Sequence, residues 1–199
     1  MPQSRRYKKK KSAGKAILAW IIVLAILAAG VFVFVSVFYE DAKKKLDEMN
    51  YPRTYSTYVE KAAKDYDLDP ALIYAVIHTE SGFDPKAESG VGAKGVMQMM
   101  PSSFEWLQEQ RGCAGQYTED DLFDPEICID YGSYLLKYFY DYYGTERSAI
   151  AAYNAGFVVS DWLNDTNYSS DGKNLDSIPY PETENYVDKV ESAKEMYIK

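Results

Sequence analysis

An uninterrupted apolar segment near the start of the chain constrains its fold more than any other feature of the sequence. Residues 16–38, AILAWIIVLAILAAGVFVFVSVF, carry no charged side chain. At ~1.5 Å per residue, a helix of this length crosses a hydrocarbon layer of about 30 Å. The segment therefore predicts one transmembrane helix, and the rest of the chain must fold as a separate domain.

The other interpretation of this segment is a cleaved signal peptide. The apolar core of such a peptide is only about 7–15 residues long, and a cleavage site with small residues follows it. The segment at 16–38 is longer, and no small-x-small site follows Phe38. The sequence therefore favours an uncleaved anchor.

Basic residues before the anchor predict its orientation. The first fifteen residues hold seven Lys and Arg residues and no acid. Because positively charged flanks stay in the cytoplasm, the N-terminus is expected inside and everything after Tyr39 outside. The predicted organisation is a cytoplasmic tail at 1–15, the anchor at 16–38, a stalk or linker at 39–53 and an extracytoplasmic domain at 54–199.

The charge of the exported part excludes one class of partner. All 30 acidic residues follow Phe38, whereas only 15 of the 22 basic residues do, so this part carries a net charge of −15. Nucleic-acid binding depends on a basic surface, and none is expected here. The anchor would instead keep the domain close to its substrate by tethering.

One carboxylate, that of Glu80, is predicted to lie on an apolar helix face. Asp69 is a favourable N-cap, Pro70 suits the first helical position and Gly82 suits the end, which together predict a helix over residues 70–81. Within this helix four residues have the i, i+3, i+4, i+7 spacing of a single face: Ile73, Val76, Ile77 and Glu80.

The position of Glu80 suggests a general acid. Desolvation raises the pKa of an acid, so a glutamate on an apolar face is expected to keep its proton near neutral pH. The alternative is that the last helical turn faces solvent and Glu80 is an ordinary surface residue. The following segment favours the first interpretation, because its glycines let backbone approach a ligand closely and Gln98 offers both a donor and an acceptor.

Three blocks of residues resemble the soluble lytic transglycosylase (goose-type lysozyme-like) family, in the order that the family has them. The first begins with Glu80-Ser81 and continues to Gly-Val-Met-Gln at 95–98, where Val96 replaces the usual Leu. The second is Ala-Tyr-Asn-Ala-Gly at 152–156, and the third is Glu-Thr-x-x-Tyr-Val at 182–187. The resemblance covers residues 55–199 and leaves out the N-terminal quarter.

The resemblance implies a fold and a reaction. It implies a lysozyme-like domain that cleaves the β-1,4 bond between N-acetylmuramic acid and N-acetylglucosamine in peptidoglycan, without a cofactor. In this family one glutamate performs both proton transfers, and the 6-hydroxyl of the muramic acid attacks C1 to form a 1,6-anhydro end. Carried over by position, Glu80 is that catalytic residue.

The resemblance also implies substrate contacts for seven residues. Ser81 would orient Glu80, and Ser89, Met97 and Gln98 would line the groove and hold the N-acetyl group. Tyr153 and Asn154 would stabilise the charged intermediate and bind substrate. Tyr186 would contact the sugar beside the glutamate. A helix-end cap is the alternative role for Ser81, and ordinary packing is the alternative for the last three. The sequence indicates no second catalytic acid beside Glu80, since Asp84 and Glu88 lie in the predicted loop.

Hydrophobic periodicity predicts an all-α domain with slight strand content. Apolar residues recur at helical spacing in several further segments, namely 54–66, 104–107, 127–143, 148–153 and from Pro181 onward. Ser102 or Ser103 is expected to cap the helix that contains residues 104–107. Residues 115–125 are expected to form a loop. Trp162 is expected in a loop from which it could reach a groove. The aromatic residues of 127–143 fit a core better than a carbohydrate platform.

The two cysteines and the single histidine are the remaining candidate functional residues. Cys113 and Cys128 lie outside the membrane in the predicted topology, where thiols oxidise, and are predicted to form a disulfide; two buried thiols are the alternative. His78 is interpreted as structural, because one histidine and two cysteines hardly suffice for a zinc site. The acidic run at 119–121 lacks the spaced oxygen ligands of a calcium loop, so no metal is expected.

The sequence as a whole predicts a membrane-anchored lytic transglycosylase that faces the cell wall. Its expected partners are peptidoglycan glycan strands and, through residues 16–38, the membrane. Two alternatives remain: a lysozyme-like hydrolase that uses water, and a glycan-binding module without activity.

Overall fold

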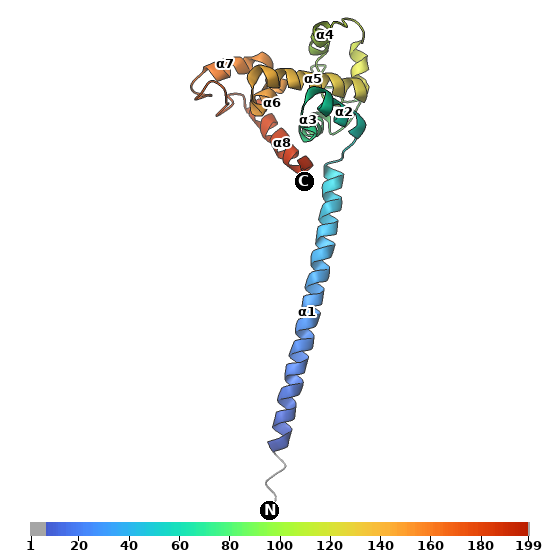
Figure 1. Cartoon of the computed structure of the whole chain (residues 1–199), viewed down its shortest axis with the longest axis vertical. Coiled ribbons are helices and arrows are strands. Elements are labelled where there is room, and N and C mark those ends of the chain that lie inside the picture. Colours follow the sequence, from blue (N-terminus) through green and yellow to red (C-terminus); the bar gives the residue numbers. More distant parts are fainter. Residues whose placement is uncertain (1–6, 199) are drawn as a thin grey trace, which may run out of the picture. The chain divides into compact units, whose positions relative to one another are not determined.

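The computed structural model describes residues 7–198, and their side chains from Gly14 onward, as helices joined by loops (Figure 1). The chain divides into two units, Met1–Asn50 and Tyr51–Lys199. The first contains α1 (Tyr7–Asn50). The second contains the remaining helical elements that the structure describes: α2 (Ser56–Tyr66), α3 (Pro70–Ser81), α4 (Pro101–Gln110), η1 (Glu119–Phe123), α5 (Pro125–Tyr143), α6 (Glu146–Ala155), η2 (Gly156–Val158), α7 (Val159–Asn164) and α8 (Pro181–Ile198).

The helix α1 has the length and composition to cross a membrane. Its most apolar part has a mean hydropathy of 3.0, and none of that part is buried by the described chain. The helix does not end at Phe38 but continues through the predicted stalk, where an ion pair of 2.9 Å between Lys45 and Asp41 supports it. The stalk is therefore an extension of the same helix as far as Asn50. Residues 1–6 of the predicted tail lie outside the described residues.

The central helix of the second unit is α3. All residues from Ala71 to Ile77 are buried in it. Its predicted bounds are confirmed: the side chain of Asp69 accepts a hydrogen bond from the backbone N–H of Ala71 at 2.9 Å, Pro70 opens the helix, and Gly82 ends it with a φ of 60°. Glu80 consequently lies in the last turn of a helix whose body is core.

The helix α8 packs along α3 and presents the face that the sequence predicted. Four residues of this face are buried: Tyr186, Val190, Ala193 and Tyr197. The N-terminal part of α8 lies beside the C-terminal part of α3, as the hydrogen bond from the Tyr186 hydroxyl to the Glu80 carboxylate shows. The pairing of α3 and α8 is the most extensive helix contact in the described chain.

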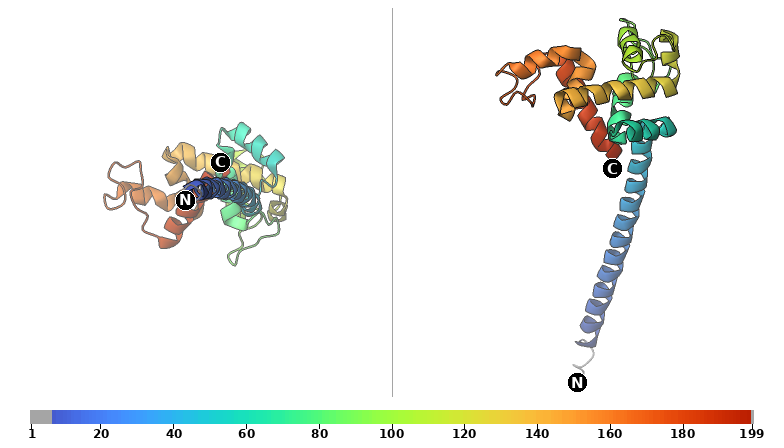
Figure 2. Two further views of the ribbon diagram at one scale, coloured as in Figure 1. Left: turned by 90° about the horizontal axis from the view of Figure 1, so that it is seen from below. Right: turned by 45° about the horizontal axis from the view of Figure 1, so that its top comes forward.

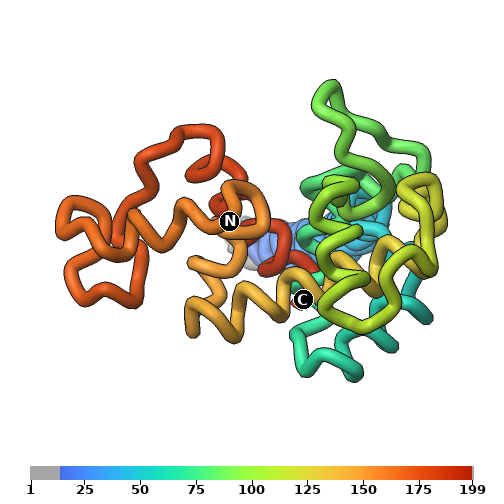
Figure 3. The backbone as a smooth tube through the Cα atoms, turned by 90° about the horizontal axis from the view of Figure 1, so that it is seen from above, coloured from blue at the N-terminus to red at the C-terminus, as the bar shows by residue number. Residues whose placement is uncertain are grey.

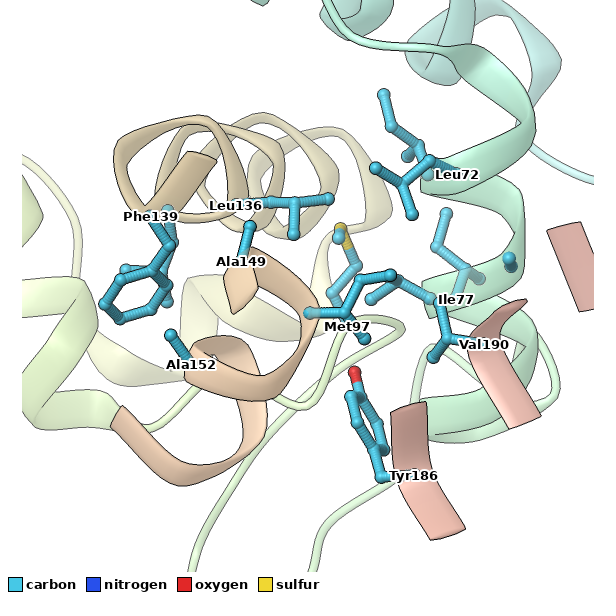
Figure 4. Close-up of a cluster of buried hydrophobic side chains, with 14 of the residues drawn as sticks. Leu72, Ile77, Met97, Leu136, Phe139, Ala149, Ala152, Tyr186 and Val190 are labelled. Atoms are coloured by element: carbon cyan, nitrogen blue, oxygen red, sulfur yellow. The ribbon is translucent and has the colours of Figure 1, made fainter. Parts of the chain in front are cut away.

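The helices α5 and α6 pack against each other (Figure 2) and contribute further residues to the core. Figure 4 shows Met97 among side chains of α3, α5 and α6, with Tyr186 extending from α8 toward them. The loop that carries Met97 can approach α5 because Gly132 has no side chain; a Cβ there would lie 2.6 Å from the Met97 sulfur. A glycine in the middle of α5 is thus explained by packing.

Two predictions about the middle of the chain are wrong. Because Pro101 is the first residue of α4 and Met100 its N-cap, neither Ser102 nor Ser103 caps that helix. The segment 115–125, predicted as loop, contains the short helix η1. A capping box supports η1: the side chain of Asp121 accepts hydrogen bonds from the backbone N–H and the hydroxyl of Thr118 at 2.7 and 2.9 Å.

The aromatic residues follow the core interpretation only in part. Trp162 lies in α7 and is 4% exposed, so the prediction that it reaches a groove from a loop is wrong. In α5, Tyr131 and Phe139 are buried, whereas Tyr142 is 59% exposed. The prediction that the aromatic residues of α5 recur at helical spacing is confirmed, but the buried face of this helix is narrower than the sequence indicated.

Two long loops interrupt the helices of the second unit, at residues 82–100 and 165–180 (Figure 3). The first loop contains isolated bridges, from Glu88 to Lys94 and from Lys94 to Met99, and no strand occurs within residues 7–198. The predicted all-α class with slight strand content is confirmed.

Candidate active site

Glu80 is partly buried at the end of α3. The hydroxyl of Tyr186 donates a hydrogen bond to Glu80 Oε1 at 2.8 Å. Burial raises the pKa of Glu80 from its usual 4.5 to about 7, although the hydrogen bond from Tyr186 acts in the opposite direction. The direction of this shift agrees with the expectation from the apolar helix face.

Two tyrosine hydroxyls lie near this carboxyl group. Tyr186 comes from α8, and Tyr153 comes from α6 and donates a hydrogen bond to the backbone carbonyl of Met97 at 2.9 Å. Burial, followed by the nearby charge of Glu80, raises the pKa of both hydroxyls well above 10. Both therefore stay protonated and can act as hydrogen-bond donors.

No second carboxylate of the described chain shifts the pKa of Glu80. The acids that follow it in the loop, Asp84 and Glu88, have exposed side chains. Glycosidases that use two carboxylates hold them roughly 5–10 Å apart, on either side of the scissile bond. In the described residues, no second carboxylate of this kind acts on Glu80.

The loop after α3 is fixed against α5 at Gly95. This residue has a φ of 76°, and a Cβ on it would lie 2.0 Å from the carbonyl oxygen of Leu122 and 2.9 Å from the sulfur of Cys128. The same sulfur lies 3.4 Å from the backbone N–H of Met97, which donates to it. These contacts hold the Met97 carbonyl where the Tyr153 hydroxyl reaches it.

Ser81 does not orient Glu80. Its hydroxyl donates a hydrogen bond to the backbone carbonyl of Val96 at 2.8 Å, and the hydroxyl that bonds to Glu80 belongs to Tyr186. The prediction for Ser81 is therefore wrong, because consecutive residues of a helix point about 100° apart and Ser81 faces the loop. Its role is to tie the end of α3 to that loop.

Three more residues of the loop make internal contacts. The hydroxyl of Ser89 accepts a hydrogen bond from the backbone N–H of Ala93 at 2.9 Å. The amide nitrogen of Gln98 donates to the carbonyls of Ala87 and Gly95, each at 3.0 Å. The side chain of Met97 is 0% exposed, so the prediction that it lines a groove is wrong for this structure. It is core, and only its carbonyl belongs to the site.

Asn154 follows Tyr153 at the end of α6 and is exposed. Its side-chain oxygen accepts a hydrogen bond of 2.8 Å from the hydroxyl of Thr183, which is 3% exposed. The family resemblance implied no separate role for Thr183. The available signal was its position three residues before Tyr186, which places both on one face of α8.

The two cysteines are free thiols, so the predicted disulfide is absent from this structure. Cys128 is buried under the loop beside Gly95, and burial raises the pKa of its thiol to about 12. Cys113 lies at another place, with its sulfur 3.3 Å from the Tyr131 hydroxyl. The two side chains meet different neighbours, which the number of residues between them did not reveal.

His78 has the surroundings of a packed residue. Its ring stacks on that of Tyr51 at a centroid distance of 5.0 Å, and burial lowers its pKa. Its Nδ1 atom is buried without a hydrogen-bond partner in the described chain. These contacts agree with the structural interpretation.

Replacing Tyr186 with phenylalanine is expected to raise the pKa of Glu80 above about 7. The tyrosine hydroxyl bonds to the charged form of the carboxylate and so lowers this pKa, and the change removes that bond while keeping the ring. NMR titration of the Glu80 carboxyl carbon in both proteins measures the shift. A lower or unchanged pKa in the variant would show that the hydrogen bond does not stabilise the carboxylate.

The fold and the site together define an all-α, lysozyme-like domain built around one partly buried glutamate. The family model described as "Transglycosylase SLT domain" matches residues 57–175, and the chain belongs to this family. The resemblance stated from the motifs is thereby confirmed.

Relatives with known names agree with this family. The chain is 32% identical over 146 residues to the soluble lytic murein transglycosylase of Escherichia coli K12, a match that covers 72% of the chain and 23% of the relative. It is 30% identical over 167 residues to the membrane-bound lytic murein transglycosylase C of Actinobacillus succinogenes, covering 73% and 47%. The chain thus spans about a quarter of the first relative and about half of the second.

A solved structure shows the same fold. An inactive mutant of the lytic transglycosylase Slt from Pseudomonas aeruginosa, in which a glutamine replaces a glutamate, superimposes with a TM-score of 0.66 and 30% identity. The match covers 75% of this chain and 25% of that one.

Proposed function

We propose that this protein is a membrane-anchored lytic transglycosylase that cleaves the β-1,4 bond between N-acetylmuramic acid and N-acetylglucosamine in peptidoglycan. Membership of the family and the names of the relatives support the reaction class. The observation that carries the proposal is the environment of Glu80, the partly buried glutamate at the end of α3. Its pKa of about 7 lets it give and take a proton at neutral pH.

In the proposed reaction Glu80 acts twice. In its acid form it donates its proton to the bridging oxygen while the bond from that oxygen to C1 of the muramic acid breaks. The resulting carboxylate removes the proton from the 6-hydroxyl of the same sugar, whose oxygen bonds to C1 and closes the 1,6-anhydro ring. Glu80 returns to its acid form, and neither water nor a cofactor is consumed.

The neighbouring donors suit the charges that this reaction creates. The hydroxyl of Tyr186 stabilises the carboxylate of Glu80 after the first proton transfer, through the bond already present at 2.8 Å. Tyr153 and Asn154 are proposed to bind the sugar. The inactive glutamate-to-glutamine mutant of a relative is consistent with a reaction that depends on one carboxyl group.

The helix α1 is proposed to anchor the protein with its N-terminus in the cytoplasm. Its apolar side chains are exposed along the segment 16–38, and the seven basic residues precede it. The relative from Actinobacillus succinogenes is named membrane-bound. In this orientation Glu80 works outside the membrane on the cell wall, and the anchor restricts it to glycan strands nearby.

Analysis of the products tests the reaction. We expect peptidoglycan digested by the detergent-solubilised full chain to yield fragments that end in 1,6-anhydro-muramic acid, which have the mass of the reducing form less one water. Mass spectrometry of the soluble fragments separates the two forms. Fragments with reducing ends alone would instead identify a lysozyme-like hydrolase that uses water.

A further inference from the structure

The first turns of α8 reach two parts of the candidate site. Tyr186 donates a hydrogen bond to Glu80 on α3, and Thr183, one turn earlier on the same face, donates one to Asn154 at the end of α6. Both α8 residues are buried, at 3% exposure for Thr183 and 8% for Tyr186. One face of α8 therefore sets the positions of an acid and of an amide that come from two different helices.

The hydrogen bond from Thr183 engages the acceptor end of the Asn154 amide. The side-chain oxygen of Asn154 accepts the threonine hydroxyl at 2.8 Å, and its amide nitrogen has no hydrogen-bond partner among residues 14–198. An asparagine amide has a donor end and an acceptor end that exchange places on a half-turn. With the oxygen engaged, the two N–H groups remain available to an external acceptor.

The hydroxyl of Thr183 is free to make this bond. A threonine within a helix often donates instead to the backbone carbonyl four residues earlier. Thr183 is the third residue of α8, so that carbonyl belongs to Pro179, before the helix begins. Its described hydrogen bond goes to Asn154 alone, and a valine at this position would keep the shape of the side chain but remove the donor.

We propose that Thr183 is a positioning residue, which holds Asn154 so that its amide N–H groups donate to an acceptor oxygen of the glycan. The inference rests on the proposed function, because it requires that Asn154 meets a sugar. An oxygen such as an N-acetyl carbonyl or a hydroxyl is the class of group that this donor fits, and Thr183 itself has no contact with it.

The test compares Thr183→Val with Thr183→Ser in the detergent-solubilised full chain acting on purified peptidoglycan. Losing the orientation of one donor is expected to lower kcat/KM about tenfold in Thr183→Val, whereas Thr183→Ser, which keeps the hydroxyl, stays near the unmodified protein. The matched control is Thr57→Val in the first turn of α2, where the threonine is exposed. It should leave kcat/KM unchanged.

A double-variant cycle separates positioning from general destabilisation. If Thr183 acts only through Asn154, adding Thr183→Val to Asn154→Ala should cause no further loss of kcat/KM. The proposal is overturned if the two losses multiply, if Thr183→Ser fails to restore activity, or if Thr183→Val behaves like Thr57→Val. Melting temperatures of all variants show whether each one is folded at the assay temperature.

Failure of the proposed function would be recognised separately. If the unmodified protein releases no fragments from peptidoglycan, the proposed reaction is wrong, and the same variants are compared by calorimetric binding of N-acetylglucosamine oligomers. Weaker binding by Thr183→Val, restored in Thr183→Ser, still supports the positioning role. Equal binding by all variants refutes it.

Discussion

Replacing Glu80 with glutamine is expected to lower the rate of peptidoglycan cleavage about 10³-fold or more, because a glutamine can neither donate nor remove a proton and each general acid–base step contributes roughly 10²–10⁴-fold. The substitution nearly preserves the shape of the side chain. The rate of fragment release by the detergent-solubilised protein measures the effect. The matched control is Glu88→Gln, an exposed glutamate in the adjacent loop, which should leave the rate unchanged.

The same variant should be more stable than the unmodified protein at alkaline pH. The pKa of Glu80 is raised in the folded state, from 4.5 to about 7, so the stability contributed by its protonated form is fully present below pH 4.5 and is lost as the pH rises to about 7. Above that pH the folded protein holds a buried carboxylate at a cost of at most ~3 kcal/mol. A neutral glutamine removes this cost, so its melting temperature should exceed that of the unmodified protein at pH 8 and approach it at pH 4.5.

These two measurements separate the remaining interpretations of Glu80. Retained cleavage in Glu80→Gln would refute the catalytic assignment. Absence of cleavage in both proteins, with unchanged binding to glycan, would identify a binding module without activity. A melting temperature of Glu80→Gln that is lower than that of the unmodified protein at pH 8 would mean that the carboxylate is solvated or otherwise stabilised in the folded state.

Replacing Gly95 with alanine is expected to destabilise the folded second unit by about 2–5 kcal/mol, the sum of ~1–2 kcal/mol for the left-handed conformation and ~1–3 kcal/mol for displaced neighbours. The added Cβ would lie 2.0 Å from the carbonyl oxygen of Leu122, where no rearrangement of a flexible side chain can relieve the overlap. Thermal unfolding followed by near-ultraviolet circular dichroism of the detergent-solubilised full chain measures the loss. Cleavage should fall as well, because the Met97 carbonyl that holds Tyr153 follows in the same loop.

Gly92→Ala is the matched control for Gly95→Ala. Gly92 has a φ of 87°, comparable with the 76° of Gly95, but a Cβ there would have no neighbour within 4 Å. It should therefore cost only the ~1–2 kcal/mol of the left-handed conformation. Equal losses in the two variants would show that conformational strain, and not contact with the backbone of Leu122, makes Gly95 necessary.

Local chemistry made the helix that carries Glu80 predictable. Its N-cap at Asp69, the proline after it and the glycine at Gly82 act within a few residues, and the structure has the helix at the predicted bounds. The apolar period placed Glu80 on a buried face for the same reason, since side chains four residues apart on a helix always point the same way. The final helix and its buried face were predictable on the same grounds.

Contacts between distant segments could not be predicted in this way. Ser81 is next to Glu80 in sequence, yet Tyr186, more than a hundred positions later, supplies the hydrogen bond. Cys113 and Cys128 appeared suited to a disulfide by compartment, but each side chain packs against a different neighbour. Met97 belongs to a motif and is nevertheless core, because Gly132 opens a space for it in α5.

The sequence by itself determined the class of the chain: an apolar segment long enough to cross a membrane, an all-α domain, and one glutamate on an apolar face. The tertiary structure alone decided which groups surround that glutamate and which way they point, including the bonds from Tyr186 to Glu80 and from Thr183 to Asn154. The physical reason is the range of the forces involved. Caps and helical periods depend on neighbours within one or two turns, whereas burial and hydrogen bonding at the site depend on how α3, α6 and α8 pack together.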